Sequence, residues 1–187
     1  HSSVLMRIVS GKYKGKRIDA PRKLPVRPTT DMAKEALFNI LNNRYFFQEL
    51  SVLDLFSGIG SISLEFASRG CEDITSVDAH AGCVSFLDAT SEKLEADIKC
   101  IRSDALSYLR KTPKKFDLIF ADPPYDLERE ELIQLVDQVM DRELLKEDGT
   151  LILEHSTRMK LEDNPFFAES RKYGGSSFTF FTSSASS

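Results

Sequence analysis

No stretch of this sequence is long and apolar enough to form a transmembrane helix, which needs roughly 18 consecutive apolar residues. Cysteine is scarce: the three cysteines are odd in number and lack CxxC spacing, which argues against both a disulfide framework and a zinc site. No secretory signal is visible either. These absences predict a cytoplasmic protein with reduced thiols, no membrane partner and no metal.

The remaining composition is typical of one folded domain. The chain has 187 residues, of which 41% are hydrophobic and 29% charged. Domains usually contain roughly 100–200 residues, and a chain of this size buries about 70% of its unfolded surface on folding. The 13 phenylalanines and the regularly spaced aliphatic runs also argue against disorder. We expect a monomer with one main domain.

Composition divides the chain into four segments. Residues 1–5 are interpreted as an expression remnant because Met6 suits a native start, and residues 183–187 form a polar tail. Residues 6–30 form a basic arm with a predicted hairpin, and residues 31–182 form the main domain.

The arm is charged oppositely to the rest of the chain. Between Met6 and Arg27, eight basic residues stand beside one acid, Asp19, so this segment carries a net charge of +7 while the whole chain carries −4. The basic residues are Arg7, Lys12, Lys14, Lys16, Arg17, Arg22, Lys23 and Arg27. A basic arm on an acidic body indicates either a surface that faces a polyanion such as a nucleic acid, or a solvated hairpin without a partner.

Strand and helix patterns alternate through the main domain. We expect strands at Val52–Phe56, Ile74–Asp78, Ile98–Ser103, Phe116–Ala121 and Thr150–Glu154, helices at Ile62–Arg69, Ala81–Leu94, Ala105–Lys111 and Glu130–Met140, and a closing strand pair at Phe166–Tyr173 and Ser177–Thr182. The arm adds a hairpin of Arg7–Ser10 and Lys16–Asp19, and a further helix begins near Thr30. This order predicts an α/β fold with a doubly wound, mostly parallel seven-stranded sheet, an antiparallel edge and an N-terminal β-hairpin extension.

Four acids stand at the carboxyl ends of the predicted strands, where open α/β sheets bind their ligands. They are Asp54, Asp78, Asp104 and Asp122. A single aspartate at a strand end is often only a helix cap. Four in succession indicate a ligand crevice.

The loop Asp54–Gly60 joins the first of these strands to a helix through two glycines, which let a ligand approach the backbone closely. The third glycine of a dinucleotide fingerprint would fall at Ser63, which disfavours NAD. A carboxylate at Asp54 also suits an ammonium group better than a pyrophosphate. S-adenosylmethionine carries an ammonium group and a sulfonium but no phosphate, so we expect this cofactor, with Asp78 at its ribose and Asp104 at its adenine.

The segment Asp122-Pro123-Pro124-Tyr125 follows a strand directly and carries the most specific signal. The prolines stiffen the loop, so the Asp122 carboxylate and the Pro123 carbonyl can accept the two hydrogens of an exocyclic NH2 group. Acceptors that orient such an amine favour its attack on a sulfonium methyl group. Tyr125 offers a flat face on which a flipped base could stack.

The segments Asp54–Gly60 and Asp122–Tyr125 resemble the cofactor loop and catalytic motif of S-adenosylmethionine-dependent amino methyltransferases. Arg27–Asp31 followed by Lys34–Leu41 is similar to the RsmD family, which methylates guanine N2 in small-subunit ribosomal RNA. The resemblance extends from Met6 to Phe181 and implies a Rossmann-like methyltransferase fold for residues 31–182.

The resemblance also implies roles for individual residues. The cofactor would contact Asp54, Phe56, Ser57, Gly58, Gly60, Asp78, Asp104 and Ala105; the guanine would be held by Asp122, Pro123, Pro124 and Tyr125; and the Arg27–Thr29 loop would close over the site. The positive charge of the arm adds the expectation that ribosomal RNA, free or in an assembling small subunit, contacts Arg7, Lys12, Lys14, Lys16, Arg17, Arg27 and Thr29. Two alternatives stay open. One is an amino methyltransferase with another NH2 target, such as DNA adenine N6 or protein glutamine, and the other is a non-catalytic RNA-binding module.

Overall fold

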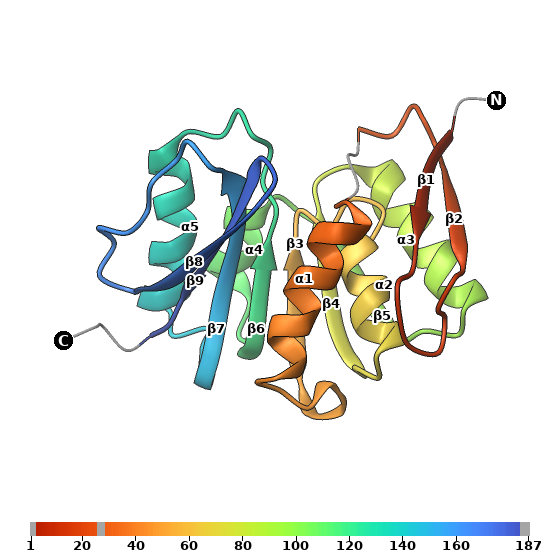
Figure 1. Ribbon diagram of the computed structural model, residues 1–187, viewed down its shortest axis with the longest axis horizontal. Coiled ribbons are helices and arrows are strands. Elements are labelled where there is room, and N and C mark those ends of the chain that lie inside the picture. Colours follow the sequence, from red (N-terminus) through yellow and green to blue (C-terminus); the bar gives the residue numbers. More distant parts are fainter. Residues whose placement is uncertain (1–2, 26–28, 184–187) are drawn as a thin grey trace.

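A computed structural model describes residues 3–25 and 29–183, which form a sheet covered by helices on both faces and a separate two-stranded hairpin (Figure 1). The sheet contains β3 (Ser51–Leu55), β4 (Asp73–Asp78), β5 (Ile98–Arg102), β6 (Phe116–Ala121), β7 (Leu145–Ser156), β8 (Phe167–Tyr173) and β9 (Ser176–Phe181). The helices are α1 (Asp31–Asn42), α2 (Ser61–Ser68), α3 (Ala81–Lys93), α4 (Ala105–Lys111) and α5 (Arg129–Asp141), with a short 3-10 turn at Phe47–Glu49. The hairpin consists of β1 (Ser3–Arg7) and β2 (Arg17–Pro21).

The seven sheet strands lie in the order β5-β4-β3-β6-β7-β9-β8. Strands β3 to β7 are parallel to their neighbours, and β9 and β8 complete one edge in antiparallel pairing. The chain therefore leaves the central strand β3 in both directions, which creates the switch point at which open α/β sheets bind ligands. The predicted fold class, with its hairpin extension, is confirmed.

Two hydrophobic cores flank the sheet because successive strand residues point to opposite faces. Val52 packs with buried residues of α1, α2 and α3, whereas its neighbour Leu53 packs with residues of α4 and α5. The same alternation separates Phe120 from Ile119 on β6. The side chain of a residue that directly follows one of these strands therefore points to one particular face of the sheet. This alternation determines where the strand-end side chains of the site lie.

Strand β7 is longer than the predicted strand Thr150–Glu154, because it begins at Leu145. Asp148 and Gly149 lie inside β7, at an irregularity in its pairing. Asp148 has a left-handed φ of 63°, and the pairing with β6 shifts register between Phe116 and Leu118. Between these two pairs β7 accommodates three residues more than β6, and the strand continues through them.

The hairpin strands also differ from the predicted Arg7–Ser10 and Lys16–Asp19, since β1 ends at Arg7 and pairs there with Arg17. The N–H groups of Val9 and Ser10 donate instead to the Glu65 carboxylate of α2, at 2.9 and 3.0 Å. A contact distant in sequence therefore ends the strand.

A buried ion pair joins the arm to the two helices behind it. Lys34 of α1 and Glu65 of α2 are both fully buried, with 3.6 Å between the ammonium nitrogen and a carboxylate oxygen. The Lys34 ammonium also donates to the Arg7 carbonyl at 2.7 Å and to the Ser61 hydroxyl at 3.1 Å. Arg69 adds a second cation at 2.9 Å from Glu65. Burial lowers the pKa of Lys34 below its ordinary value, and the Glu65 carboxylate opposes that shift.

The turn between β1 and β2 is attached to the end of α2. Ser68 accepts the Tyr13 N–H at its hydroxyl and the Lys12 N–H at its carbonyl, at 2.9 and 2.8 Å, and its hydroxyl donates to the Ser10 carbonyl. Gly11 is required here, because a Cβ at this position would lie 2.0 Å from the Ser68 carbonyl oxygen. The arm is therefore a docked part of the domain surface.

Within the described part of the chain, no helix has the length and apolar character that spanning a bilayer would require. Cys71, Cys83 and Cys100 are all free thiols, and burial raises the pKa of each to about 11. They are protonated near neutral pH and thus poor nucleophiles.

Replacing Lys34, the buried cation that joins the arm to α1 and α2, should destabilise the protein. Lys34→Met keeps the aliphatic stem but removes three contacts, so we expect the free energy of unfolding to fall by about 3–5 kcal/mol, as for other broken buried pairs. Urea denaturation measures the change. The double variant Lys34→Met with Glu65→Gln should recover part of the loss, because the buried carboxylate that lost one of its two cations is then neutral. A loss below about 1 kcal/mol in the single variant would contradict this account.

Candidate active site

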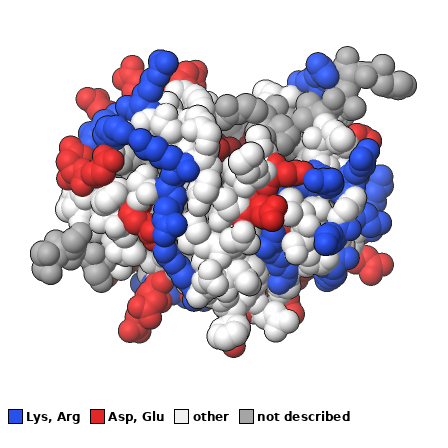
Figure 2. Space-filling model, in the orientation of Figure 1, with Lys and Arg blue, Asp and Glu red and all other residues white. Residues whose placement is uncertain are grey.

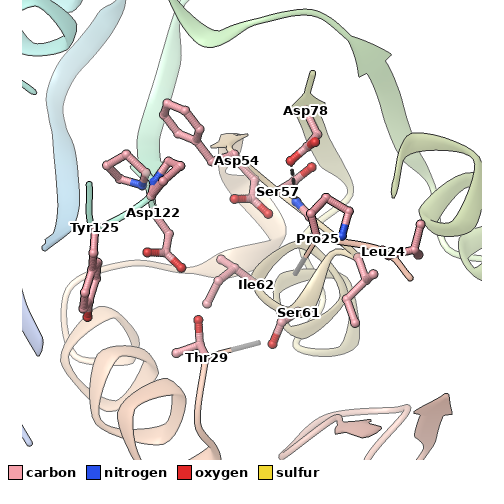
Figure 3. A pocket seen from close by; sticks show the side chains of 15 residues that line it. Leu24, Pro25, Thr29, Asp54, Ser57, Ser61, Ile62, Asp78, Asp122 and Tyr125 are labelled. Atoms are coloured by element: carbon pink, nitrogen blue, oxygen red, sulfur yellow. Dashed lines mark hydrogen bonds between the residues drawn. The ribbon is translucent and has the colours of Figure 1, made fainter. Parts of the chain in front are cut away.

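A cavity of about 490 Å3 opens at the carboxyl ends of β3, β4 and β6, at the switch point of the sheet. Figure 3 shows the carboxylates of Asp54 and Asp122 directed into the same space, with Thr29 and Ser61 across from them. Asp78 lies at the far side of the loop that follows β3. Among the described residues that line the cavity there are three carboxylates and no Lys or Arg. The lining therefore favours a cationic ligand over a phosphate.

The loop after β3 is held in an unusual backbone conformation. Phe56 has a φ of 58° although it is not a glycine, and Gly58 has a φ of 54°. Two backbone N–H groups of the loop are hydrogen-bonded to β4. The Ser57 N–H donates to the Val77 carbonyl at 3.0 Å, and the Gly58 N–H donates to the Asp78 carboxylate at 2.9 Å. Strained backbone of this kind persists where the surroundings determine it.

Asp78 positions two loops at once. One carboxylate oxygen accepts the Gly58 N–H and the other accepts the His80 N–H, each at 2.9 Å. A carboxylate has about four acceptor positions, so Asp78 can still accept hydroxyl groups of a ligand.

Asp54 lies below the loop in a buried hydrogen-bond network. The Ser63 hydroxyl of α2 donates to its carboxylate at 2.6 Å and is also hydrogen-bonded to the Ser76 hydroxyl of β4. Asp54 is 1% exposed, and burial raises the pKa of its carboxyl group to about 7, while the bond from Ser63 opposes the shift. Ser63 therefore takes the place of the missing fingerprint glycine and supports an acid at the cavity floor.

The Asp122–Tyr125 segment forms the opposite wall of the cavity. Its turn is closed by the Leu127 N–H, which donates to the Pro124 carbonyl at 3.0 Å. The Tyr125 hydroxyl is hydrogen-bonded to the Ser176 hydroxyl at the start of β9. With 41% of Tyr125 exposed, its ring remains accessible for stacking.

Most of the predicted cofactor residues line this cavity, but three do not. Gly60 is turned toward α3, where an added Cβ would lie 2.2 Å from a Leu87 methyl carbon, so its role in the structure is helix packing. Asp104 caps α4: its carboxylate accepts the Ser107 N–H at 3.0 Å and the Ser107 hydroxyl at 2.6 Å. Ala105 is buried in the first turn of that helix. The predicted contacts of these three with a cofactor stay predictions.

The predicted RNA-binding residues lie on the hairpin and beside the cavity. Lys12, Lys14, Lys16 and Arg17 are exposed, and Lys and Arg side chains gather over the hairpin at the right of Figure 2. Arg7 is paired with Asp31 at 2.7 Å. Thr29 lines the cavity itself, while Arg27 lies outside the described residues.

Sequence reasoning missed several residues of the cavity. Leu24 and Pro25 of the arm lie against the cofactor loop, and Ser61 and Ile62 begin α2 beneath it. A second cavity of about 370 Å3 shares Thr29 and Asp122 with the first and is lined also by Met32, Glu154 and the turn between β8 and β9. Glu154 ends a predicted strand, so the rule that selected the other strand-end acids could have found it.

The raised pKa of Asp54 makes stability depend on pH. The pKa of its carboxyl group is about 7 in the folded protein, against an ordinary value of 3.8 that applies in the unfolded chain. Between these two pH values the group is therefore protonated mainly in the folded state. The unfolding free energy should therefore fall as pH rises from about 4 to 7, by about 1.4 kcal/mol per unit at most, and then level off. In Asp54→Asn, denaturation curves recorded at each pH should not show this fall in the unfolding free energy between about pH 4 and 7. Parallel pH profiles of the two proteins would contradict it.

Comparison with known proteins places the chain in a family. Residues 6–182 match the family model described as Conserved hypothetical protein 95. The Bacillus subtilis protein named "Putative rRNA methyltransferase YlbH" is 33% identical over 84% of this chain and 86% of its own length. "Ribosomal RNA small subunit methyltransferase D" of Buchnera aphidicola is 35% identical over 64% of this chain and 61% of its own length.

One solved structure extends the likeness to the fold. The T. thermophilus 16S rRNA N2 G1207 methyltransferase RsmC, in complex with AdoMet and guanosine, is similar with a TM-score of 0.72 and 21% identity, over 96% of this chain and 50% of that one. The family match covers nearly the whole chain and agrees with the resemblance drawn from the motifs. The chain belongs to the Conserved hypothetical protein 95 family, which is the RsmD family.

Proposed function

We propose that this protein transfers a methyl group from S-adenosylmethionine to the exocyclic N2 amine of a guanine in small-subunit ribosomal RNA. The observation that carries the proposal is a cavity with three carboxylates and no described Lys or Arg, which adjoins the Asp122–Tyr125 segment. Such a cavity suits a cationic cofactor, and the adjoining segment suits an amine.

The carboxylates that line the cavity fit this cofactor. Asp54 and Asp78 both line the cavity. In this proposal Asp54 binds the ammonium group of the cofactor, and Asp78 accepts hydrogen bonds from its ribose hydroxyls with its remaining acceptor positions. A volume of about 490 Å3 lies within the range of cofactor sites. When bound, S-adenosylmethionine supplies a methyl group on a positively charged sulfur.

The protein's own part in the reaction is to orient the amine. The guanine N2 lone pair is delocalised into the ring, so the amine is a weak nucleophile. Asp122 and the Pro123 carbonyl accept its hydrogens, which aims the nitrogen at the cofactor and stabilises positive charge as the new bond forms. Tyr125 stacks on the base and keeps it out of the RNA helix.

The docked arm supplies the RNA-binding surface. Lys12, Lys14, Lys16 and Arg17 are exposed on a hairpin whose backbone is attached to α2, so they present positive charge to phosphates from a fixed position. A ribosomal RNA substrate places the enzyme in the cytoplasm. We expect it to act as a monomer, with residues 31–182 as the methyltransferase domain.

The names of the relatives support ribosomal RNA over the alternative targets. Both curated relatives are named as ribosomal RNA methyltransferases, and the T. thermophilus enzyme is described with guanosine bound. DNA adenine N6 and protein glutamine also present an NH2 group, but no observation favours either. A binding module without catalysis would not need Asp122 beside an acidic cofactor cavity.

Removal of the Asp122 carboxylate tests the mechanism. Asp122→Ala should stay folded, bind S-adenosylmethionine nearly normally and transfer labelled methyl groups to ribosomal RNA at least about a hundredfold more slowly, because one preorganised electrostatic partner is lost. Asp122→Asn should be milder, since its amide oxygen still accepts. Single-turnover assays at saturating cofactor and RNA measure the rate.

The controls of this experiment also test the substrate class. DNA and protein fractions should remain unlabelled under the same conditions. Labelling of either fraction in preference to ribosomal RNA would reject the proposed substrate, and a wild-type rate in Asp122→Ala would reject the proposed catalytic residue.

Neutralising the hairpin lysines tests the RNA-binding surface. The triple variant Lys12→Gln, Lys14→Gln, Lys16→Gln should bind ribosomal RNA more weakly, and the slope of log affinity against log salt should flatten by roughly 0.7–0.9 per lost phosphate contact. Cofactor affinity, measured by calorimetry, should not change.

A matched control uses lysines at the opposite edge of the sheet. Lys111, Lys115 and Lys146 are exposed near the amino ends of β6 and β7, far along the strands from the cavity. Their triple Gln variant carries the same charge change and should keep the wild-type salt slope. Equal slopes in the hairpin variant and the wild type would place the RNA elsewhere.

A further inference from the structure

The second cavity lies on the α1 face of the sheet, next to the cofactor cavity. Its walls are the start of α1, the ends of β6 and β7, and the turn between β8 and β9. It holds about 370 Å3 and shares Thr29 and Asp122 with the cofactor cavity. A ligand in one can therefore meet a ligand in the other at Asp122.

Strand register places a second carboxylate beside Asp122. Ala121 of β6 pairs with Leu153 of β7 in a parallel ladder, so the next residues, Asp122 and Glu154, continue side by side. Ala121 and Leu153 pack in the core on the α4 and α5 face, and the following residues point to the other face. Glu154 is only 4% exposed, yet it lines the second cavity together with Asp122.

Two neighbouring carboxylates match one edge of one nucleobase. Guanine presents two adjacent kinds of donor on its Watson–Crick edge, the N1–H and the N2 amine. Adenine has an acceptor at N1 and cytosine has one at N3, so each would place a lone pair against a carboxylate. Neighbouring strands are about 4.8 Å apart, which lets side chains from both reach donors on a single ring.

We propose that Glu154 is the specificity-determining residue of this site and accepts the N1–H of the target guanine while Asp122 accepts the N2 amine. This inference rests on the proposed function and deepens it. The base would occupy the second cavity between Asp122 and the β8–β9 turn. Ser176 at the start of β9 lines this cavity and is hydrogen-bonded to the Tyr125 hydroxyl, which places Tyr125 next to it. A carboxylate offers about four acceptor positions, so Glu154 can accept the N1–H alongside its contacts within the protein.

A base analogue separates recognition from catalysis. 2-Aminopurine keeps the N2 amine but has a bare acceptor at N1. The methylated guanine is first mapped by mass spectrometry in ribosomal RNA treated with the wild-type enzyme. The RNA is then rebuilt by ligation with guanine or 2-aminopurine at that position. We expect the wild type to methylate the 2-aminopurine RNA at least about a hundredfold more slowly, because a buried acceptor is left facing an acceptor.

Glu154→Gln should reduce this discrimination. Its amide N–H can donate to the bare N1 of 2-aminopurine, so methylation of the 2-aminopurine RNA should become faster relative to that of the guanine RNA. The same N–H would face the N1–H of guanine, so the guanine rate should fall. The ratio of the guanine rate to the 2-aminopurine rate should therefore drop at least tenfold. A merely structural role of Glu154 would lower both rates together and leave the ratio unchanged. Glu147→Gln, an exposed glutamate on the same strand at the opposite edge of the sheet, serves as the matched control and should keep the wild-type ratio.

The outcomes distinguish this inference from the proposed function. A wild-type enzyme that forms no N2-methylguanine in ribosomal RNA would reject the function and the inference with it. A wild type that methylates guanine and 2-aminopurine equally would reject the inference alone, whether or not Glu154→Gln folds. An unchanged ratio in a folded Glu154→Gln variant with normal cofactor affinity would do the same.

Discussion

The buried pair of Lys34 and Glu65 is the contact on which the arrangement of the site depends. Glu65 accepts the N–H groups that end β1, and Lys34 reaches both the arm backbone and Ser61, the first residue of α2. Ser61 also lines the cofactor cavity. This buried ion pair thus joins the basic arm to the helices α1 and α2. Charges buried this deeply persist only with several partners, and here the arm backbone supplies them.

Charge is separated across the molecule in a way that suits the proposed reaction. The cavities are lined by carboxylates, whereas exposed lysines gather on the hairpin. An acidic cavity repels the phosphate backbone but accepts a cationic cofactor and the donor edge of a base. In the proposed reaction, this separation would attract the RNA backbone to the arm and exclude it from the site, so that only an extruded base would enter.

Local patterns predict most of this structure, because strand alternation, helix caps and strand-end acids are short-range features. Asp54, Asp78 and Asp122 each lie at the carboxyl end of a predicted strand, and all three line one cavity. The remaining features depend on contacts distant in sequence. Asp104 stands at a strand end like the others, but its carboxylate is used by Ser107. Glu154 also ends a predicted strand, but the register of β6 and β7 is needed to show that it lies beside Asp122.

The close approach of Gly11 to Ser68 has a consequence for how a substrate is selected. Hydrogen bonds attach the hairpin turn to α2, so the backbone that carries the lysines has a defined position relative to Asp122. In the proposed reaction, the distance between the phosphates bound by the arm and the target base is therefore set by the fold. Selection of the guanine would then depend on the folded shape of the RNA more than on the bases beside it.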